Sequence, residues 1–275
     1  MHDTPSSTLF IVGLGVNLPD HITPEATRAM SQCSRLYSIV QAPQRSWLPP
    51  GTLGKIEVID AFQMYAEDKP RVQNYERVAR TIFQALDVCG SVGYVTYGNP
   101  MSYDSVAQNL VQYAKKSGLP IRIIPGISSI DTILCDLGVD LAPGLQVYEA
   151  TWLVACAIRP HLEAAALLVQ MGTFGSLRTN YQKRPAGASL AKLVNYLCEF
   201  YPGAHQVFLV RSSNGEGEPP RIRQFEIQNL CAAASDDLAG ASLYIPAVQH
   251  PRFDNAIVEG MKTELKPDRA PDSVR

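Results

Sequence analysis

The sequence contains no run of apolar residues long enough to cross a membrane. Stretches such as Leu9–Val12 fall far short of the roughly 18 to 20 residues that a spanning helix needs. Residues 1–7 also lack the basic start and the apolar segment of a secretion signal. Charge is nearly balanced, with 24 Lys plus Arg against 26 Asp plus Glu and a formal net charge of -2. The positive excess typical of proteins that bind nucleic acid or anionic lipid is therefore missing. Since a membrane span and a secretion signal are missing too, we expect a cytoplasmic protein.

Cysteine and histidine are too scattered to predict a disulfide framework or a metal site. The six cysteines run from Cys33 to Cys231 without a Cys-x-x-Cys pair, and the five histidines show no His-x-x-x-His spacing. We therefore predict no bound metal. Most of the cysteines are expected to be small buried hydrophobic residues.

The first half of the chain has the alternating pattern of an α/β domain. With 275 residues, of which 46% are hydrophobic, the chain is long enough for one large or two modest domains. Helices are predicted at Thr23–Cys33, with Thr23 as N-cap and Pro24 as first helical residue, and at Ser105–Lys116. The predicted strands are Thr8–Gly13, Leu36–Val40, Ile56–Ile59, Val92–Tyr97 and Ile121–Ile124.

The clearest helical pattern covers Arg71–Val88. Apolar residues at helical spacing predict the buried face, namely Val72, Tyr75, Ala79, Ile82, Phe83 and Leu86. The polar positions predict the exposed face, namely Asn74, Glu76, Arg77 and Arg80.

After Pro125-Gly126, strand patterns outnumber helical ones, which predicts a second α/β or α+β domain. One helix is expected at Ser189–Tyr201 and a polar surface loop at Ser212–Pro220. The predicted strands are Leu145–Glu149, Leu167–Met171, Gln206–Arg211, Ile222–Ile227 and Ser242–Ile245. The expected division is a flexible N-terminus at 1–7, domains at 8–125 and 126–247, and a C-terminal region at 248–275 with a helix at 250–265 and a charged tail.

Three turns at the predicted carboxyl ends of strands are candidates for ligand contact. A dinucleotide site at Gly13-Leu14-Gly15 is disfavoured, because Leu18 stands where the Gly-x-Gly-x-x-Gly pattern requires its third glycine. Together the turns predict a ligand crevice at one edge of a sheet. Their sequences are Gly13-Leu14-Gly15, Tyr97-Gly98-Asn99-Pro100-Met101 and Pro125-Gly126-Ile127-Ser128-Ser129.

In their order and spacing, these turns resemble the tetrapyrrole methylase family. The resemblance covers about residues 8 to 247 and implies two α/β domains with S-adenosylmethionine in the cleft between them. Asn99 stands where tetrapyrrole-modifying members usually carry aspartate, which argues against a tetrapyrrole substrate. The resemblance also implies cofactor contacts, mostly through backbone, by Gly13, Gly15, Tyr97, Gly98, Asn99, Pro100, Met101, Ser128, Ser129, Gln170 and Met171.

Further segments resemble the borosin branch, whose members methylate backbone nitrogens of ribosomal peptides. These segments are Phe62–Tyr75, Tyr148–Thr151, Val169–Gly172 and Ser242–Pro246. The resemblance implies catalytic roles for Tyr65, Arg71 and Tyr75, a precursor peptide as substrate, and a homodimer. Since few residues follow Pro246 and the last of them are charged, we expect a split system in which the peptide is a separate chain. Modification of the chain's own tail is the alternative.

The residue types in this run suit amide methylation. An amide nitrogen is a poor nucleophile because its lone pair is delocalised, so methyl transfer requires the imidate form. A tyrosine beside a guanidinium can act as base, and the same cation can stabilise negative charge on the amide oxygen. Arg71 lies at the positive end of its predicted helix and should need compensating contacts. Whether Tyr65 or Tyr75 is the base stays open. The competing functions are a tetrapyrrole or other small-molecule methyltransferase and a non-catalytic binding protein.

Overall fold

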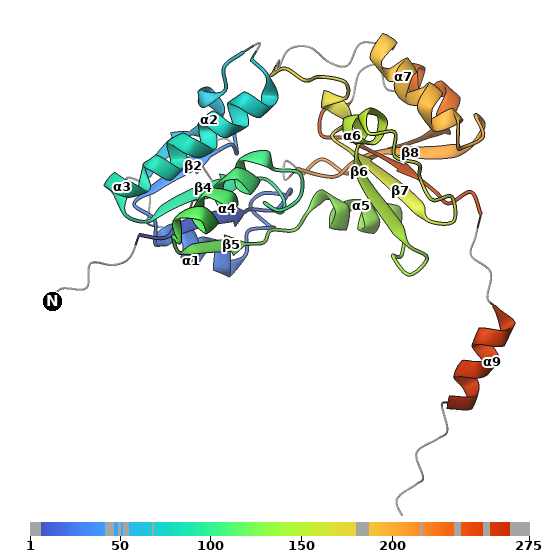
Figure 1. Cartoon of the computed structure of the whole chain (residues 1–275), viewed down its shortest axis with the longest axis horizontal. Coiled ribbons are helices and arrows are strands. Elements are labelled where there is room, and N and C mark those ends of the chain that lie inside the picture. The colour runs from blue at the N-terminus through green and yellow to red at the C-terminus, as the bar shows by residue number, and fades with distance from the viewer. Residues whose placement is uncertain are drawn as a thin grey trace, which may run out of the picture.

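The computed structural model describes residues 7–41, 47–48, 51, 55–67, 69–179, 187–214, 217–233, 238–249 and 254–264. Figure 1 shows two lobes side by side, each built around one five-stranded sheet. Strands β1 to β5 form the first sheet and β6 to β10 form the second, so each lobe uses a continuous part of the sequence. The predicted α/β fold with two sheets is confirmed.

The first sheet is parallel, in the order β3-β2-β4-β1-β5. All five of its strands were predicted, with ends that agree within two residues. Because parallel strands run in one direction, the turns after β1, β4 and β5 lie at the same edge of the sheet. The strands are β1 (Leu9–Gly13), β2 (Arg35–Ser38), β3 (Glu57–Asp60), β4 (Val92–Thr96) and β5 (Ile121–Ile124).

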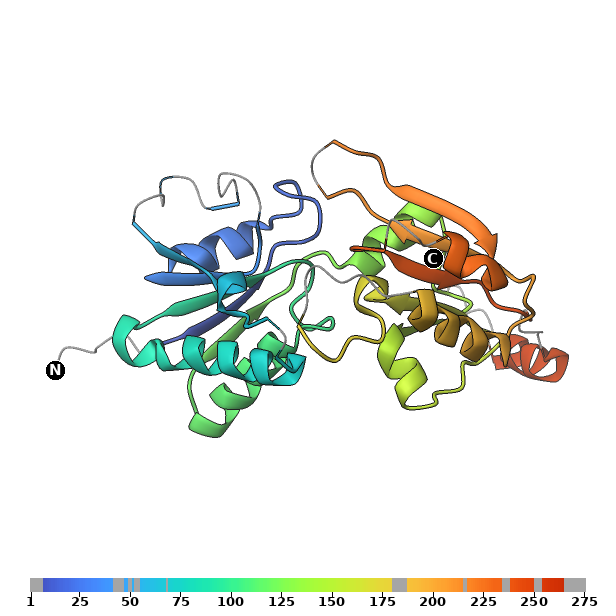
Figure 2. The same cartoon turned by 90° about the horizontal axis from the view of Figure 1, so that it is seen from above.

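Helices cover both faces of the first sheet (Figure 2). Side chains of β1 alternate between the faces, so that Leu9 and Ile11 pack in the cluster formed with α2 and α4, whereas Phe10 and Val12 pack with α1. Thr23 caps α1 as predicted, and its hydroxyl accepts from Ala26 N. The helices are α1 (Pro24–Ser31), α2 (Arg71–Gln84), α3 (Leu86–Cys89) and α4 (Ser105–Ser117), and a short 3-10 turn, η2 (Ala61–Met64), follows β3.

The predicted helix at Arg71–Val88 needs two corrections. It is divided at Ala85 into α2 and α3. Its buried face is also rotated at the first turn, because Asn74 is 1% exposed while Val72 is 76% exposed. The pattern of apolar residues missed this rotation, since the first turn of α2 contacts polar backbone of the second lobe rather than the apolar core.

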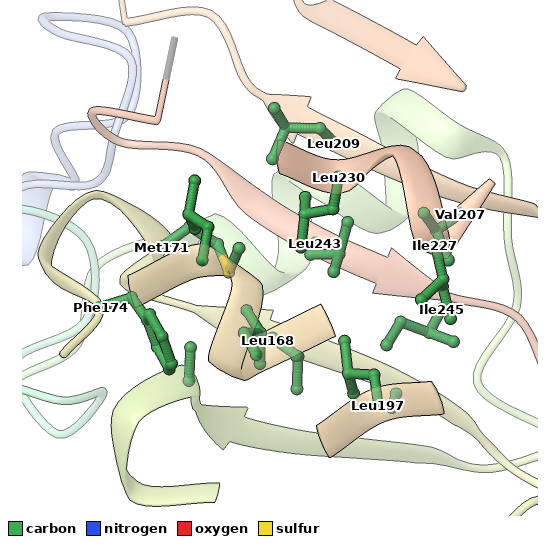
Figure 3. Close-up of a cluster of buried hydrophobic side chains, with 14 of the residues drawn as sticks. Leu168, Met171, Phe174, Leu197, Val207, Leu209, Ile227, Leu230, Leu243 and Ile245 are labelled. Carbon is green, nitrogen blue, oxygen red and sulfur yellow. The ribbon is translucent and has the colours of Figure 1, made fainter. Parts of the chain in front are cut away.

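The second sheet is mixed, in the order β6-β7-β10-β8-β9, with only the β6–β7 pair parallel. All five strands were predicted. Figure 3 shows the core of this lobe, in which Leu168 and Leu243 from central strands pack near Leu197 of α7. The strands are β6 (Leu145–Glu149), β7 (Ala165–Val169), β8 (Gln206–Arg211), β9 (Arg221–Glu226) and β10 (Ser242–Ile245).

The helices of the second lobe were predicted less completely than its strands. The helix expected at Ser189–Tyr201 is observed as α7 (Gly187–Cys198), whereas α6 (Ala150–Ala155) was not predicted. The chain passes from the first lobe to the second between β5 and α5 (Ser129–Leu137), and α5 packs on the second sheet (Figure 1). The short elements are η3 (Met171–Thr173), η4 (Ile227–Asn229) and α8 (Leu230–Ala233).

Two further expectations concern the cysteines and the C-terminal region. The prediction that most cysteines are buried is wrong, because Cys33 alone among the six is buried and Cys135, Cys156 and Cys198 are exposed on or beside helices. Helix α9 (Asn255–Glu264) lies within the helix predicted at 250–265 and stands apart from both lobes in Figure 1. The predicted tail and the first residues of that helix lie outside the described residues. No described helix is long and apolar enough to span a bilayer.

Tyr201 places a hydroxyl group in the core of the second lobe. Its side chain is 2% exposed, and within the described part of the chain its hydroxyl oxygen has no hydrogen-bond partner. Replacement by phenylalanine keeps the ring and removes the unpaired polar group. We therefore expect Tyr201→Phe to raise the free energy of unfolding by about 1–3 kcal/mol, measured by urea unfolding at pH 8.

The pH dependence of stability provides a second readout for the same variant. Burial raises the pKa of Tyr201 to about 12. The folded state therefore holds this proton more tightly than the unfolded state, and stability falls as pH rises from about 10 to 12. Tyr201→Phe should lose less stability than wild type in this range. Tyr196→Phe is the matched control, because Tyr196 donates to Ile158 O at 2.8 Å and its loss should destabilise. A lower unfolding midpoint for Tyr201→Phe at pH 8 would contradict the prediction.

Candidate active site

The three predicted turns meet at one edge of the first sheet. Gly98 N donates to Gly15 O at 2.9 Å and Gly15 N donates to Gly98 O at 3.3 Å, and both glycines have positive φ. The third turn packs directly on this pair, since a Cβ added to Gly126 would lie 2.3 Å from Gly98 O. Glycine at these positions thus lets three backbone segments touch.

A methyl group at Gly126 should push these turns apart. Its Cβ would meet Gly98 O, Gly15 N at 2.6 Å and Gly13 C at 2.7 Å, all backbone atoms that cannot rotate away. We expect Gly126→Ala to lower the free energy of unfolding by about 1–3 kcal/mol, measured by thermal unfolding. Gly260→Ala is the control, because a Cβ there meets nothing within 4 Å. A wild-type melting temperature for Gly126→Ala would refute this account of the turns.

Beside the turns lies a cavity of about 350 Å³ with mainly aromatic walls, which we call the aromatic cavity. Two of the three expected catalytic residues, Tyr65 and Tyr75, line it from the segments on either side of the start of α2. Gln170 closes it from the second lobe. The complete lining is Ile39, Phe62, Tyr65, Tyr75, Tyr94, Thr96, Tyr97, Ser102, Tyr103, Asp104, Ser105 and Gln170.

Arg71 is the first residue of α2, where the helix dipole disfavours a cation. Three acceptors compensate it. Its Nε donates to Tyr75 Oη at 2.7 Å, Nη1 donates to Ser176 O at 3.3 Å, and Nη2 donates to Gln170 Oε1 at 3.4 Å. The guanidinium is therefore held between the lobes with its charge directed at the hydroxyl of Tyr75.

The two tyrosines contact each other through their rings. Their centroids are 6.0 Å apart and their planes meet at 78°, an edge-to-face arrangement. Both pack against the core of the first lobe and are partly buried, and both line the aromatic cavity. This arrangement places two neighbouring phenol side chains at the aromatic cavity, and the Arg71 guanidinium that contacts Tyr75 lines the adjoining space between the lobes.

An acidic group also lines the aromatic cavity. The Asp104 carboxylate caps α4 through Ala107 N and accepts from the buried Tyr94 hydroxyl at 3.0 Å. Burial raises the pKa of the Asp104 carboxyl, and burial likewise raises the pKa of Tyr94 well above its ordinary value. Tyr94 therefore keeps its proton at neutral pH and holds it toward the carboxylate.

A second cavity, of about 500 Å³, lies between the lobes, and we call it the interlobe cavity. It shares the wall residues Ser102, Tyr103 and Gln170 with the aromatic cavity, so a ligand in one lies next to a ligand in the other. The complete lining is Arg71, Ser102, Tyr103, Ser129, Ile130, Val169, Gln170, Gly172, Thr173, Ala239, Gly240, Ala241 and Ser242.

The residues predicted to contact a cofactor divide into three groups. Tyr97, Ser129 and Gln170 line one or both cavities. The other predicted residues of the first two turns line neither cavity and instead contact one another, namely Gly13, Gly15, Gly98, Asn99, Pro100 and Met101. Asn99 stabilises its own turn by accepting from Met101 N at 2.9 Å. Two of the predicted residues, Ser128 and Met171, use their side chains for other contacts.

Ser128 forms a capping box with Asp131 at the start of α5, and Met171 is fully buried in the second core. A ligand at Ser128 or Met171 would therefore contact backbone atoms rather than side chains.

Several lining residues were not predicted from the sequence. Tyr103 has a φ of 62° and exposes its backbone oxygen to Gln170, whose Nε2 donates to it at 3.2 Å. The segment Ala239–Ser242 reaches the interlobe cavity just before β10. The one sequence signal for it is a glycine, Gly240, directly before a predicted strand.

Comparison with known protein families gives a match over most of the chain. The model of the tetrapyrrole (corrin/porphyrin) methylases matches residues 8–213. This range includes the whole first sheet, the three glycine turns, the segment from Phe62 to Tyr75 and the second lobe through β8.

Curated relatives include fungal proteins of greater length. The chain is 29% identical over 177 residues to the methyltransferase and ribosomally synthesized cyclic peptide gymnopeptides precursor of Gymnopus fusipes, covering 62% of this chain and 40% of that protein. It is 24% identical over 276 residues to the methyltransferase and cyclic peptide lentinulin A precursor of Lentinula edodes, covering 98% of this chain and 64% of that protein. The chain thus spans less than two thirds of either relative.

Solved structures share the two-lobed architecture. Uroporphyrin-III C-methyltransferase of Thermus thermophilus complexed with S-adenyl homocysteine superposes with a TM-score of 0.61 at 14% identity, over 87% of this chain and 97% of that chain. At this identity the likeness concerns the fold.

Proposed function

This chain belongs to the tetrapyrrole (corrin/porphyrin) methylase family, and on that premise we propose that it transfers methyl groups from S-adenosylmethionine to backbone amide nitrogens of a ribosomally made peptide. The observation that carries the proposal is the placement of Tyr65, Arg71 and Tyr75 where the aromatic and interlobe cavities adjoin. The names of the two fungal relatives, which join a methyltransferase to a peptide precursor, support the peptide class.

The interlobe cavity suits S-adenosylmethionine in size and chemistry. Its volume of about 500 Å³ lies within the range of small-molecule sites, and Ser102 and Ser129 bring hydroxyl groups to its wall. At the lining residue Gly172 the backbone packs closely on a neighbouring segment, because a Cβ on Gly172 would lie 2.7 Å from Leu238 O. When bound, this cofactor supplies an electrophilic methyl group whose bond to sulfur breaks as its bond to the amide nitrogen forms.

The chain's own residues act on the amide of the substrate. One of the two tyrosines, Tyr65 or Tyr75, takes the amide proton and later releases it to solvent. The hydroxyl of the other tyrosine and the Arg71 guanidinium hold the carbonyl oxygen, where the negative charge of the imidate develops. Arg71 Nε donates to Tyr75 Oη at 2.7 Å, so the cation and one phenol oxygen lie side by side, which supports joint action on one amide.

We further propose that the substrate peptide is a separate chain and that the enzyme is a homodimer. Tyr97 and Tyr103, which are 44% and 39% exposed, lie at the surface of the aromatic cavity, so a peptide can reach it from solvent. Exposed apolar residues at the start of α2 support a second copy, namely Val72 and Leu177, whose backbone oxygen accepts from Arg71 N. Light scattering at micromolar concentration tests the second point, and a monomer would contradict it.

Coexpression with peptides encoded beside the gene, followed by mass spectrometry, tests the proposed activity. We expect mass increases of whole methyl groups, and fragmentation should place them on backbone nitrogens. Intact mass of the enzyme itself separates modification of its own tail from modification of another chain. Transfer to uroporphyrinogen in place of any peptide, or methylation confined to side chains, would overturn the proposal.

A further inference from the structure

Asn74 is a buried polar residue that lies between Arg71 and Tyr75 in the sequence of α2. Its side chain is 1% exposed. Asparagine is a poor residue for a helix interior, and a buried amide costs stability unless its hydrogen bonds are made. Here both ends of the amide are used, so the site is built to hold this side chain.

The Asn74 amide binds the backbone beside Tyr65. Its Oδ1 accepts from Ala66 N at 3.0 Å, and its Nδ2 donates to Ala66 O at 2.7 Å. On the other side of Tyr65, Arg77 donates to Met64 O. Two side chains of α2 thus hold the residues before and after Tyr65, which fixes the backbone from which the tyrosine ring enters the aromatic cavity.

The same amide reaches the second lobe. Asn74 Nδ2 also donates to Thr179 Oγ1 at 2.7 Å, and Thr179 is 5% exposed. The backbone around this contact is paired, because Thr179 N donates to Lys69 O at 2.9 Å and Arg71 N donates to Leu177 O at 3.0 Å. Asn74 therefore lies where the Tyr65 segment, the start of α2 and the second lobe meet.

We propose that Asn74 is a positioning residue that holds Tyr65 in register with Arg71 and Tyr75, and that Thr179 ties this arrangement to the second lobe, which contributes Gln170 to the site. The inference rests on the proposed function for its catalytic readout. A displacement of about 1 Å in a reacting group can cost about 10²-fold in rate, so loss of this contact should act mainly on kcat.

Four variants separate the contacts. Asn74→Leu removes all of them at similar volume, and Asn74→Asp keeps the acceptor but removes both donors. Thr179→Val removes only the link to the second lobe, and Thr179→Ser restores its hydroxyl. Val78→Ala is the control for general loss of stability, because Val78 is buried one turn further along α2 and has no polar contact to lose.

Two measurements are made on the full chain. Transfer from S-adenosylmethionine to the coexpressed neighbouring peptide gives kcat and KM, and hydrogen exchange gives the protection of residues 62–67. We expect Asn74→Leu to lower kcat about 10²-fold with little change in the KM for S-adenosylmethionine and with faster exchange at Ala66. Asn74→Asp and Thr179→Val should lie between Asn74→Leu and wild type, and Thr179→Ser should recover most of the rate. Val78→Ala should lower the melting temperature and leave kcat within about twofold of wild type.

The results distinguish this inference from the proposed function. If wild type transfers no methyl group to any peptide, the proposed function fails, yet faster exchange at Ala66 in Asn74→Leu would still support the placement of Tyr65 by Asn74. If wild type is active and Asn74→Leu keeps the kcat of Val78→Ala, or changes KM alone, the positioning role is wrong.

Discussion

Replacing Arg71 by alanine is expected to slow methyl transfer by about 10²–10³-fold, the usual loss when one donor to a developing oxyanion is removed. The variant loses the donor to Tyr75 Oη at 2.7 Å and the contacts to Ser176 O and Gln170 Oε1. It therefore removes the contact that orients the Tyr75 hydroxyl and the stabilisation of the imidate together. Single-turnover transfer at saturating S-adenosylmethionine measures the chemical step directly.

A lysine at position 71 separates charge from geometry. Its ammonium keeps the charge, but it cannot reproduce the planar fork that serves three acceptors from both lobes. We expect Arg71→Lys to recover part of the rate and Arg71→Ala none of it. Arg80→Ala is the control on the same helix, because Arg80 is exposed, pairs with Glu76 and lines neither cavity. Equal rates for Arg71→Ala and Arg80→Ala would remove Arg71 from the mechanism.

Strands such as β1 and β4 could be predicted because each one is a short buried run bounded by turn residues. Leu9–Gly13 is fully buried, and the glycine turn that follows ends it in the sequence as well as in the structure. The sequence also predicted that three turns lie at one edge of the sheet, because parallel strands place their carboxyl ends together. The sequence pattern could not show how closely the three turns pack, because this depends on the contact of Gly126 with Gly98, two residues from separate segments.

The first turn of α2 shows why part of the site could not be predicted. Helical spacing assigns a buried position to Val72 and an exposed one to Asn74, and the structure has the reverse. Hydrophobic periodicity assumes that a buried face is apolar. At this turn the neighbour is the polar backbone at Ala66 and the Thr179 hydroxyl, so a polar side chain is buried. Contacts between distant segments leave no periodic signal.

The roles of the two tyrosines lead to the second large effect. Removing a general base typically costs 10²–10⁴-fold in rate, so Tyr75→Phe and Tyr65→Phe should each be severely slowed. Tyr113→Phe is the matched control, because that hydroxyl contacts Glu76 away from both cavities. Wild-type turnover by both Tyr65→Phe and Tyr75→Phe, with normal binding of S-adenosylhomocysteine, would exclude both tyrosines from the reaction.

The pH profile identifies which tyrosine is the base. Arg71 donates to Tyr75 Oη at 2.7 Å, which fixes this oxygen beside the cation, whereas Tyr65 lines the same cavity as Tyr94 and Asp104. We therefore expect Tyr75 to take the amide proton and Tyr65 to donate to the carbonyl oxygen. A base gives kcat/KM an ascending limb with pH, which should vanish in Tyr75→Phe and persist at lower height in Tyr65→Phe. The opposite pattern would exchange the two roles, because the limb follows whichever residue must lose its proton before the amide can lose its own.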